Sequence, residues 1–182
     1  MNIYLCGMIG SGKTAVGTLL ADRLGRPFLD LDREMDRELG RSFHELVREK
    51  GWLAFRELEY TICKRFAAMK NSVIALGGGT VRYEWNRDIL SGSGIRILLQ
   101  ADLGVLADRV RRADRPRVNA GTSLEADLRK IWEEHSGLYL NFADVVYHTD
   151  VGRSVEEETE DVLDILRARG LLDRQHPAAE GE

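Results

Sequence analysis

The stretch Gly7-Met8-Ile9-Gly10-Ser11-Gly12-Lys13-Thr14 fits the pattern G-x-x-x-x-G-K-[ST]. Directly before it, Ile3–Cys6 is an apolar run that reads as a buried strand, and directly after it apolar residues recur at helical spacing as far as Leu24. A strand, a glycine-rich turn and a helix in this order are the context in which the pattern binds phosphate. The stretch therefore predicts a nucleotide-binding loop, against the alternative of a glycine-rich turn that merely precedes a helix.

Each residue type in this loop suits the binding of phosphate. Glycines let the backbone turn with positive φ, so that its N–H groups face phosphate oxygens, and the helix N-terminus adds partial positive charge at the same point. The Lys13 ammonium is expected to reach the β and γ phosphates, and the Thr14 hydroxyl is expected to bind Mg²⁺. Backbone amides of Gly10, Ser11 and Gly12 complete the predicted phosphate site.

Strand and helix patterns alternate along the rest of the chain. Strands are predicted at Ile3–Cys6, Pro27–Leu31, Ser72–Leu76, Ile95–Leu99 and Val145–Tyr147. Helices are predicted at Lys13–Leu24, from the capping box at Ser42 to near Gly51, at Leu53–Met69, at Leu103–Arg112, from the end of the 113–123 loop to Tyr139, and from the Ser154 capping box to Gly170. Helices between strands imply parallel pairing in a three-layer α/β/α sandwich, whose ligands lie beyond the carboxyl ends of the strands.

Length and composition limit what this fold can do. The 182 residues suit one domain, which we place at 1–172, with a mobile lid loop at about 113–123 and a frayed polar tail at 173–182. Lys and Arg number 26 against 30 Asp and Glu, a net charge of −4 that argues against a nucleic-acid or membrane-surface binder. We expect the protein to be cytoplasmic, because no apolar run approaches a membrane span and the first residues lack a basic leader. We also expect it to be a monomer.

Two carboxylates follow the second predicted strand. Strand alternation places Asp30 and Asp32 on one side and Leu31 on the other. One carboxylate suits Mg²⁺, which takes oxygen ligands, and the other suits the acceptance of a proton from an attacking hydroxyl. The structural alternative is that Asp32 only caps a helix over Arg33–Leu39.

A glycine triplet and a charged pair are further candidates for the binding site. Gly77-Gly78-Gly79 ends the third strand, which indicates backbone that passes close to a ligand. No aspartate ends this strand, as it does in many phosphate-loop enzymes, so Asp30 is the candidate carboxylate for Mg²⁺. Arg56 and Glu59 share one face of a helix, with a surface ion pair as the alternative.

Five arginines lie in and before the predicted mobile loop, which would bring positive charge to a bound phosphate. They are Arg109, Arg111, Arg112, Arg115 and Arg117. Arginines on a closing loop clamp phosphates and stabilise a transferring phosphoryl group. A solvated basic helix end is the alternative, above all for Arg111 and Arg112.

These ordered motifs, spread over about Asn2 to Gly170, resemble the shikimate kinase family within the nucleoside-monophosphate-kinase-like phosphate-loop fold. The resemblance implies the sheet order 2-3-1-4-5 and transfer of the γ-phosphate of ATP to the 3-hydroxyl of shikimate, a step in aromatic amino-acid biosynthesis. It implies ATP contacts at Gly10, Ser11, Gly12, Lys13, Thr14, Ala15, Arg109 and Arg115, and Mg²⁺ at Thr14 and Asp30. It implies shikimate contacts at Asp32, Arg56, Gly77, Gly78, Gly79 and His135, and catalytic roles for Lys13, Asp32 and Arg115.

His135 departs from the family pattern. The family has an arginine that binds the substrate carboxylate in an R-x-P-L-Y stretch, where this chain reads His135-Ser136-Gly137-Leu138-Tyr139. Arginine is always charged and binds carboxylate with a two-pronged fork, whereas histidine is charged only near or below pH ~6.5. Arg117 is the alternative source of the missing cation, and an exposed helix position is the structural alternative for His135.

The sequence is also compatible with two other functions. One is a different small-molecule kinase of the same fold, such as a gluconate-like or nucleoside monophosphate kinase. The combination of Asp-x-Asp, Phe-Arg-x-x-Glu and the glycine triplet counts against it. The other is a nucleotide-binding homologue without catalysis, and the presence of Lys13, Thr14 and Asp32 counts against that.

Overall fold

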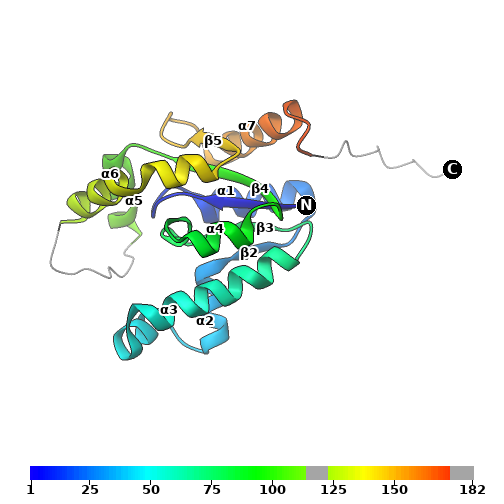
Figure 1. Cartoon of the computed structure of the whole chain (residues 1–182). Helices are drawn as coiled ribbons and strands as arrows, with labels where there is room; N and C mark the ends of the chain where they lie inside the picture. Colours follow the sequence, from blue (N-terminus) through cyan, green and yellow to red (C-terminus); the bar gives the residue numbers. More distant parts are fainter. Residues whose placement is uncertain (114–122, 173–182) are drawn as a thin grey trace.

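The computed structural model describes residues 1–113 and 123–172, and in this part of the chain five strands form one parallel sheet in the order β2-β3-β1-β4-β5 (Figure 1). The strands are β1 (Asn2–Cys6), β2 (Phe28–Asp30), β3 (Val73–Ala75), β4 (Gly94–Gln100) and β5 (Val145–His148). The predicted fold class and the sheet order implied by the family resemblance are both confirmed.

Helices cover both faces of this sheet. They are α1 (Lys13–Leu24), α2 (Leu31–Leu39), α3 (Phe43–Ala68), α4 (Glu84–Leu90), α5 (Leu103–Arg112), α6 (Leu124–Phe142) and α7 (Val155–Ala168), with a short 3-10 turn η1 (Thr80–Arg82). One buried cluster joins the sheet to α1 and α7, and the other joins it to α2, α3, α4, α5 and α6. Figure 1 shows α2 and α3 at the bottom of the view and α6, β5 and α7 at the top.

The central strand β1 is buried on both faces, which explains its continuous apolar run. Ile3 and Leu5 contribute to the α1–α7 cluster, whereas Tyr4 and Cys6 contribute to the cluster on the opposite face. Burial raises the pKa of the Cys6 thiol to about 12, as expected for a cysteine that packs as a small hydrophobe. The carboxyl end of β1 then delivers the chain directly into the loop before α1.

The end of β2 and the cap of α2, both near the site, differ from the prediction. Strand β2 ends at Asp30, and Leu31 and Asp32 belong to α2, so strand alternation does not govern Asp32. The cap of α2 is Asp30, whose Oδ1 accepts from the N–H groups of Asp32 (3.1 Å) and Arg33 (3.4 Å). The alternative that Asp32 caps this helix was therefore wrong, because the Asp30 carboxylate, two residues earlier, already accepts from the free amides.

Other boundaries follow the local chemistry. Gly51, with φ 79° and ψ 180°, breaks α3 where the sequence predicted the end of one helix and the start of another. Ser42 caps the N–H of His44 instead of that of Glu45, so the first predicted capping box is wrong, while the box at Ser154 and Glu157 is present.

Helix α4 was not predicted, because its seven residues bury only two side chains and show no apolar period. The predicted mobile loop and tail fall mainly on 114–122 and 173–182, outside the described residues.

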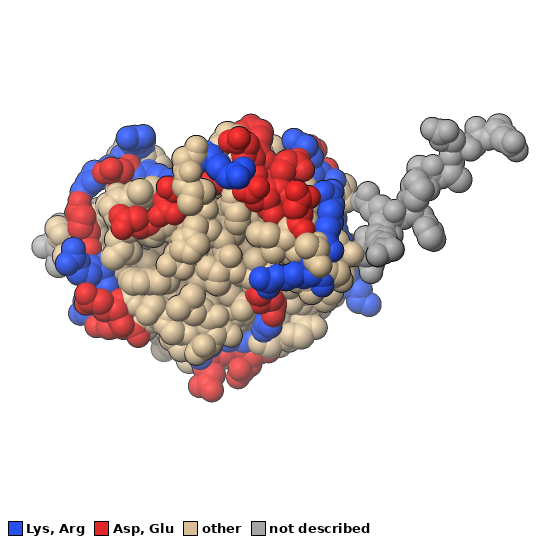
Figure 2. Space-filling view, turned by 90° about the horizontal axis from the view of Figure 1, so that it is seen from above, with Lys and Arg blue, Asp and Glu red and all other residues tan. Residues whose placement is uncertain are grey.

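Charged side chains of both signs surround a broad uncharged area on the face seen in Figure 2. Among the helices of the described ranges, none combines the length and the apolar character needed to cross a bilayer.

Asn2 links β1 to the end of α3 inside the protein. The fully buried Asn2 amide donates to the carbonyls of Phe66 and Met69, each at 3.0 Å, and Asn2 Oδ1 accepts from the N–H of Ser72 at 3.1 Å. Buried polar groups that lose their partners each cost about 1–3 kcal/mol. The Asn2 side chain thus ties the end of α3 to the residue before β3 through backbone groups at a helix end.

We predict that Asn2→Ala lowers the free energy of unfolding by at least about 2 kcal/mol, because the Met69 carbonyl and the Ser72 N–H lose their buried partner and the Phe66 carbonyl loses one of its donors. Urea denaturation measures the loss, and an unchanged m-value shows that both forms unfold between similar states. Asn141→Ala, at an exposed position on α6, is the matched control and is expected to change stability by less than about 0.5 kcal/mol. An Asn2→Ala loss no larger than the control's would contradict this account.

Candidate active site

The loop between β1 and α1 lies at the carboxyl edge of the sheet and depends on its glycines. Gly7, Gly10 and Gly12 have φ of 140°, 83° and 93°. A Cβ on Gly10 would lie 2.9 Å from the carbonyl oxygen of Leu106, so the loop also needs the missing side chain for space. Gly12 begins α1 without a side-chain cap, which leaves the first N–H groups of that helix to an anion.

Lys13 and Thr14 begin the helix that follows this loop. The Lys13 ammonium donates to the carbonyl oxygens of Gly7 and Met8, each at 2.9 Å, and these bonds fix it beside the loop. The Thr14 hydroxyl donates to Asp30 Oδ2 at 2.9 Å. The two side chains predicted to bind Mg²⁺ therefore lie together, although they come from α1 and β2.

The donor set at Thr14 and Asp30 fits Mg²⁺. It offers a hydroxyl and a carboxylate oxygen, and Mg²⁺ in phosphate-transfer sites is held by one or two such groups together with water and substrate phosphates. In the described part of the chain no group of three or more His, Cys, Asp and Glu side chains could enclose a metal by itself. The site therefore suits an ion that arrives with a nucleotide.

The glycine triplet lies between the phosphate loop and Asp32. A Cβ on Gly77 would lie 2.9 Å from Thr80 Oγ1 and 3.2 Å from Asp32 Oδ1, and a Cβ on Gly78 would lie 3.2 Å from the backbone nitrogen of Ile9. The triplet thus packs closely against segments that are far apart in the sequence, and its predicted approach to a ligand stays a prediction. Asp32 therefore lies beside Gly77, and the phosphate loop lies beside Gly78 of the same triplet.

Arg56 is buried, so the alternative of a surface ion pair was wrong. Its Nη1 lies 2.7 Å from Glu59 Oε2, and the side chains are only 11% and 1% exposed. Its guanidinium carbon lies 4.6 Å from the ring centre of Phe55 and 4.3 Å from that of Tyr83. The buried Nε of Arg56 has no hydrogen-bond partner among the described residues, so this position suits an anionic ligand that accepts from it.

Glu59 is the centre of a buried polar network that the sequence only partly indicated. The Glu59 carboxylate accepts hydrogen bonds from Arg56, from the Thr80 hydroxyl at 2.9 Å and from the Asn86 amide at 3.0 Å. Thr80 follows the glycine triplet directly, which was an available signal, whereas Asn86 lies on the unpredicted helix α4. The network fixes Arg56 relative to the triplet.

Helix α6 reaches the triplet from the other side. The fully buried Tyr139 hydroxyl donates to the carbonyl oxygen of Gly78, and burial raises the pKa of Tyr139 to about 12. His135 lies four residues earlier and so shares this face of the helix. Its side chain is 30% exposed, with Nε2 3.8 Å from Glu134 Oε2, so it is half-buried instead of exposed.

The arginines separate into different environments. Arg109 Nη1 donates to the Thr149 hydroxyl at 2.9 Å and to the Gly10 carbonyl oxygen at 3.4 Å, which places Arg109 at the phosphate loop. Arg111 pairs on the surface with Asp108 at 2.8 Å, as the solvated alternative predicted. Arg115 and Arg117 lie outside the described residues.

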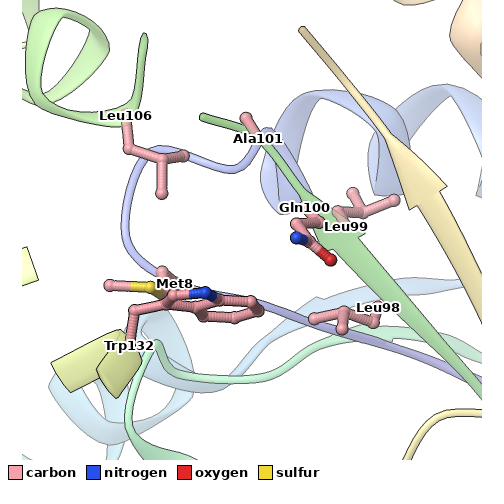
Figure 3. Close-up of a pocket in the computed structure, with 7 residues that line it drawn as sticks. All are labelled: Met8, Leu98, Leu99, Gln100, Ala101, Leu106 and Trp132. Carbon is pink, nitrogen blue, oxygen red and sulfur yellow. The ribbon is translucent and has the colours of Figure 1, made fainter. Parts of the chain in front are cut away.

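A small apolar pocket underlies the loop (Figure 3). It is lined by Met8 from the loop, by Leu98, Leu99, Gln100 and Ala101 at the end of β4, and by Leu106 and Trp132. Apart from the Gln100 amide and the indole N–H of Trp132, these side chains are apolar. The pocket therefore reflects mainly the packing of α6 against the loop.

Comparisons with known proteins agree with this geometry. The sequence model of the shikimate kinase family matches residues 9–167. A shikimate kinase of Symbiobacterium thermophilum is 39% identical over 173 residues, which cover 93% of this chain and 98% of the relative. One of Chlorobium luteolum is 36% identical and covers 91% of this chain and 87% of the relative.

A solved structure gives the same result. The shikimate kinase from Acinetobacter baumannii, in complex with shikimate, has a TM-score of 0.87 at 31% identity, and the match covers 94% of this chain and 95% of that one. Sequence and structure therefore show, as the ordered motifs predicted, that this chain belongs to the shikimate kinase family.

Proposed function

We propose that this protein transfers the γ-phosphate of ATP to the 3-hydroxyl of shikimate, with Mg²⁺ as the metal. The observation that carries the proposal is the glycine triplet, which brings the phosphate loop, Asp32 and the Arg56 network to one place. A kinase needs a triphosphate and an acceptor hydroxyl side by side, because in-line transfer depends on position.

The nucleotide half of the site lies at the phosphate loop. Backbone amides of Gly10, Ser11, Gly12, Lys13, Thr14 and Ala15, together with the Lys13 ammonium, would hold the phosphates. Thr14 would hold Mg²⁺ directly and Asp30 through water, and the ion neutralises charge on the phosphate oxygens when it is bound. Arg109 would contact the adenine, and Arg115, which lies outside the described residues, would contact the γ-phosphate.

The acceptor half lies between the triplet and α3. The buried guanidinium of Arg56 would bind the shikimate carboxylate, and Gly77, Gly78 and Gly79 would lie against the ring. Asp32 would orient the 3-hydroxyl and accept its proton as the new O–P bond forms and the bond from the γ-phosphorus to the bridging oxygen breaks. ADP then leaves with the bridging oxygen.

We predict that Lys13→Ala and Asp32→Asn each lower kcat at least about 100-fold, because one removes charge from the phosphates and the other removes the proton acceptor. A coupled assay of ADP release with shikimate measures the loss, and gluconate and AMP as alternative acceptors test the related kinase activities. Asp88→Asn, at an exposed position on α4, is the control for loss of a carboxylate elsewhere. Turnover of Asp32→Asn at the control's rate would contradict the assignment of the base, and ADP binding without turnover of any acceptor would favour a non-catalytic homologue.

We predict that His135→Arg lowers the KM for shikimate. A guanidinium is always charged and binds a carboxylate with two parallel hydrogen bonds, whereas an imidazole offers single donors. Initial rates at fixed saturating ATP measure the effect, and the KM for ATP serves as the internal control. A KM for shikimate that His135→Arg leaves unchanged would contradict a place for position 135 at the substrate carboxylate.

A further inference from the structure

Thr149 joins three segments at the carboxyl edge of the sheet. It follows β5 directly, and it is only 2% exposed. Its N–H donates to the carbonyl oxygen of Gln100 at 2.8 Å, which continues the pairing of β5 with β4. Its hydroxyl lies 3.2 Å from the carbonyl oxygen of Ser11, in the phosphate loop.

Arg109 makes both of its contacts with Thr149 through the end of its guanidinium. Nη1 donates to the Thr149 hydroxyl at 2.9 Å, and Nη2 donates to the Thr149 carbonyl oxygen. A hydroxyl donates one hydrogen bond while it accepts another, so Thr149 can bind Arg109 and Ser11 at the same time. Two bonds to one residue fix the plane of the guanidinium as well as its position.

The fixed guanidinium lies beside the loop that holds the phosphates, since Arg109 Nη1 is also 3.4 Å from the Gly10 carbonyl oxygen. The N–H groups at the edge of the guanidinium donate to Thr149 and Gly10, so its flat face is the part that suits a ligand. Flat guanidinium faces stack on aromatic rings, and a purine base is such a ring. A guanidinium that rotates freely would lose this stacking surface.

We propose that Thr149 is a positioning residue that fixes Arg109 for the base of the bound nucleotide. The inference rests on the proposed function, in which Arg109 contacts adenine, and adds the residue through which that contact is set. Thr149 itself need not touch the nucleotide.

A purely structural role for Thr149 is the competing explanation. The backbone bond to Gln100 already fastens the end of β5 to β4, and it does not depend on the side chain. Thr149→Val keeps the shape and the backbone bond and removes only the hydroxyl, and Thr149→Ser keeps the hydroxyl. A structural role in packing predicts that valine is the better replacement, whereas the positioning role predicts that serine is.

The test compares a ligand that has a base with one that lacks it. Calorimetric binding of ADP and of inorganic tripolyphosphate, both with Mg²⁺, is measured for the full chain and its variants. We expect Thr149→Val to weaken ADP binding about fivefold to tenfold, an effect of the size of one typical hydrogen bond. We expect tripolyphosphate and shikimate binding to change less than twofold, and Thr149→Ser to bind ADP as the unmodified protein does.

A second arm tests whether Thr149 acts through Arg109. In an Arg109→Ala background, Thr149→Val is expected to cause no further loss of ADP affinity, because the group that it positions is gone. Equal losses for ADP and tripolyphosphate, or additive losses in the double variant, would overturn the inference. Thr149→Ala gives the same comparison if the valine variant does not fold. Failure of the unmodified protein to bind either ligand would contradict the proposed function instead.

Discussion

The site depends on a backbone turn that only glycine accommodates well, at the end of a strand buried on both faces. Gly7, Gly10 and Gly12 allow this turn, and the other parts of the site contact it. Asp30 binds Thr14 after the loop, Gly78 packs against Ile9, and Arg109 and Thr149 bind the carbonyl oxygens of Gly10 and Ser11. A change in the turn would therefore move the nucleotide and acceptor halves together.

The acceptor half rests on a different interaction, the burial of Arg56 with Glu59. Burying two charges costs free energy that their attraction does not always return, so such a pair is weak evidence for stability. Its value here is positional, because Thr80 and Asn86 share Glu59 and so tie the guanidinium to the glycine triplet and to α4. One buried donor of Arg56 has no partner among the described residues, which fits a pair arranged for a ligand.

Local patterns predicted much of this arrangement. The apolar run of β1, the glycine spacing and the helical period after Lys13 are local signals, and they identified the loop and the alternation of strands and helices. The sequence identified Asp30 as a candidate Mg²⁺ ligand but not as the cap of α2, because the end of β2 could not be placed to the residue. The residues missed were those whose role depends on tertiary contacts. Asn86 belongs to a short helix without apolar period, and the partners of Thr149 come from two distant segments.

The central claim is that the two halves act on one phosphoryl group, and locating that group in the product tests it most directly. The protein is incubated with ATP, Mg²⁺ and shikimate, and phosphorus–proton correlation by NMR assigns the carbon that carries the new phosphate. The account predicts one product, with phosphorus coupled to the proton on carbon 3 of shikimate and one ADP formed for each. Inorganic phosphate without a phosphorylated acid, or phosphate on another hydroxyl, would contradict it.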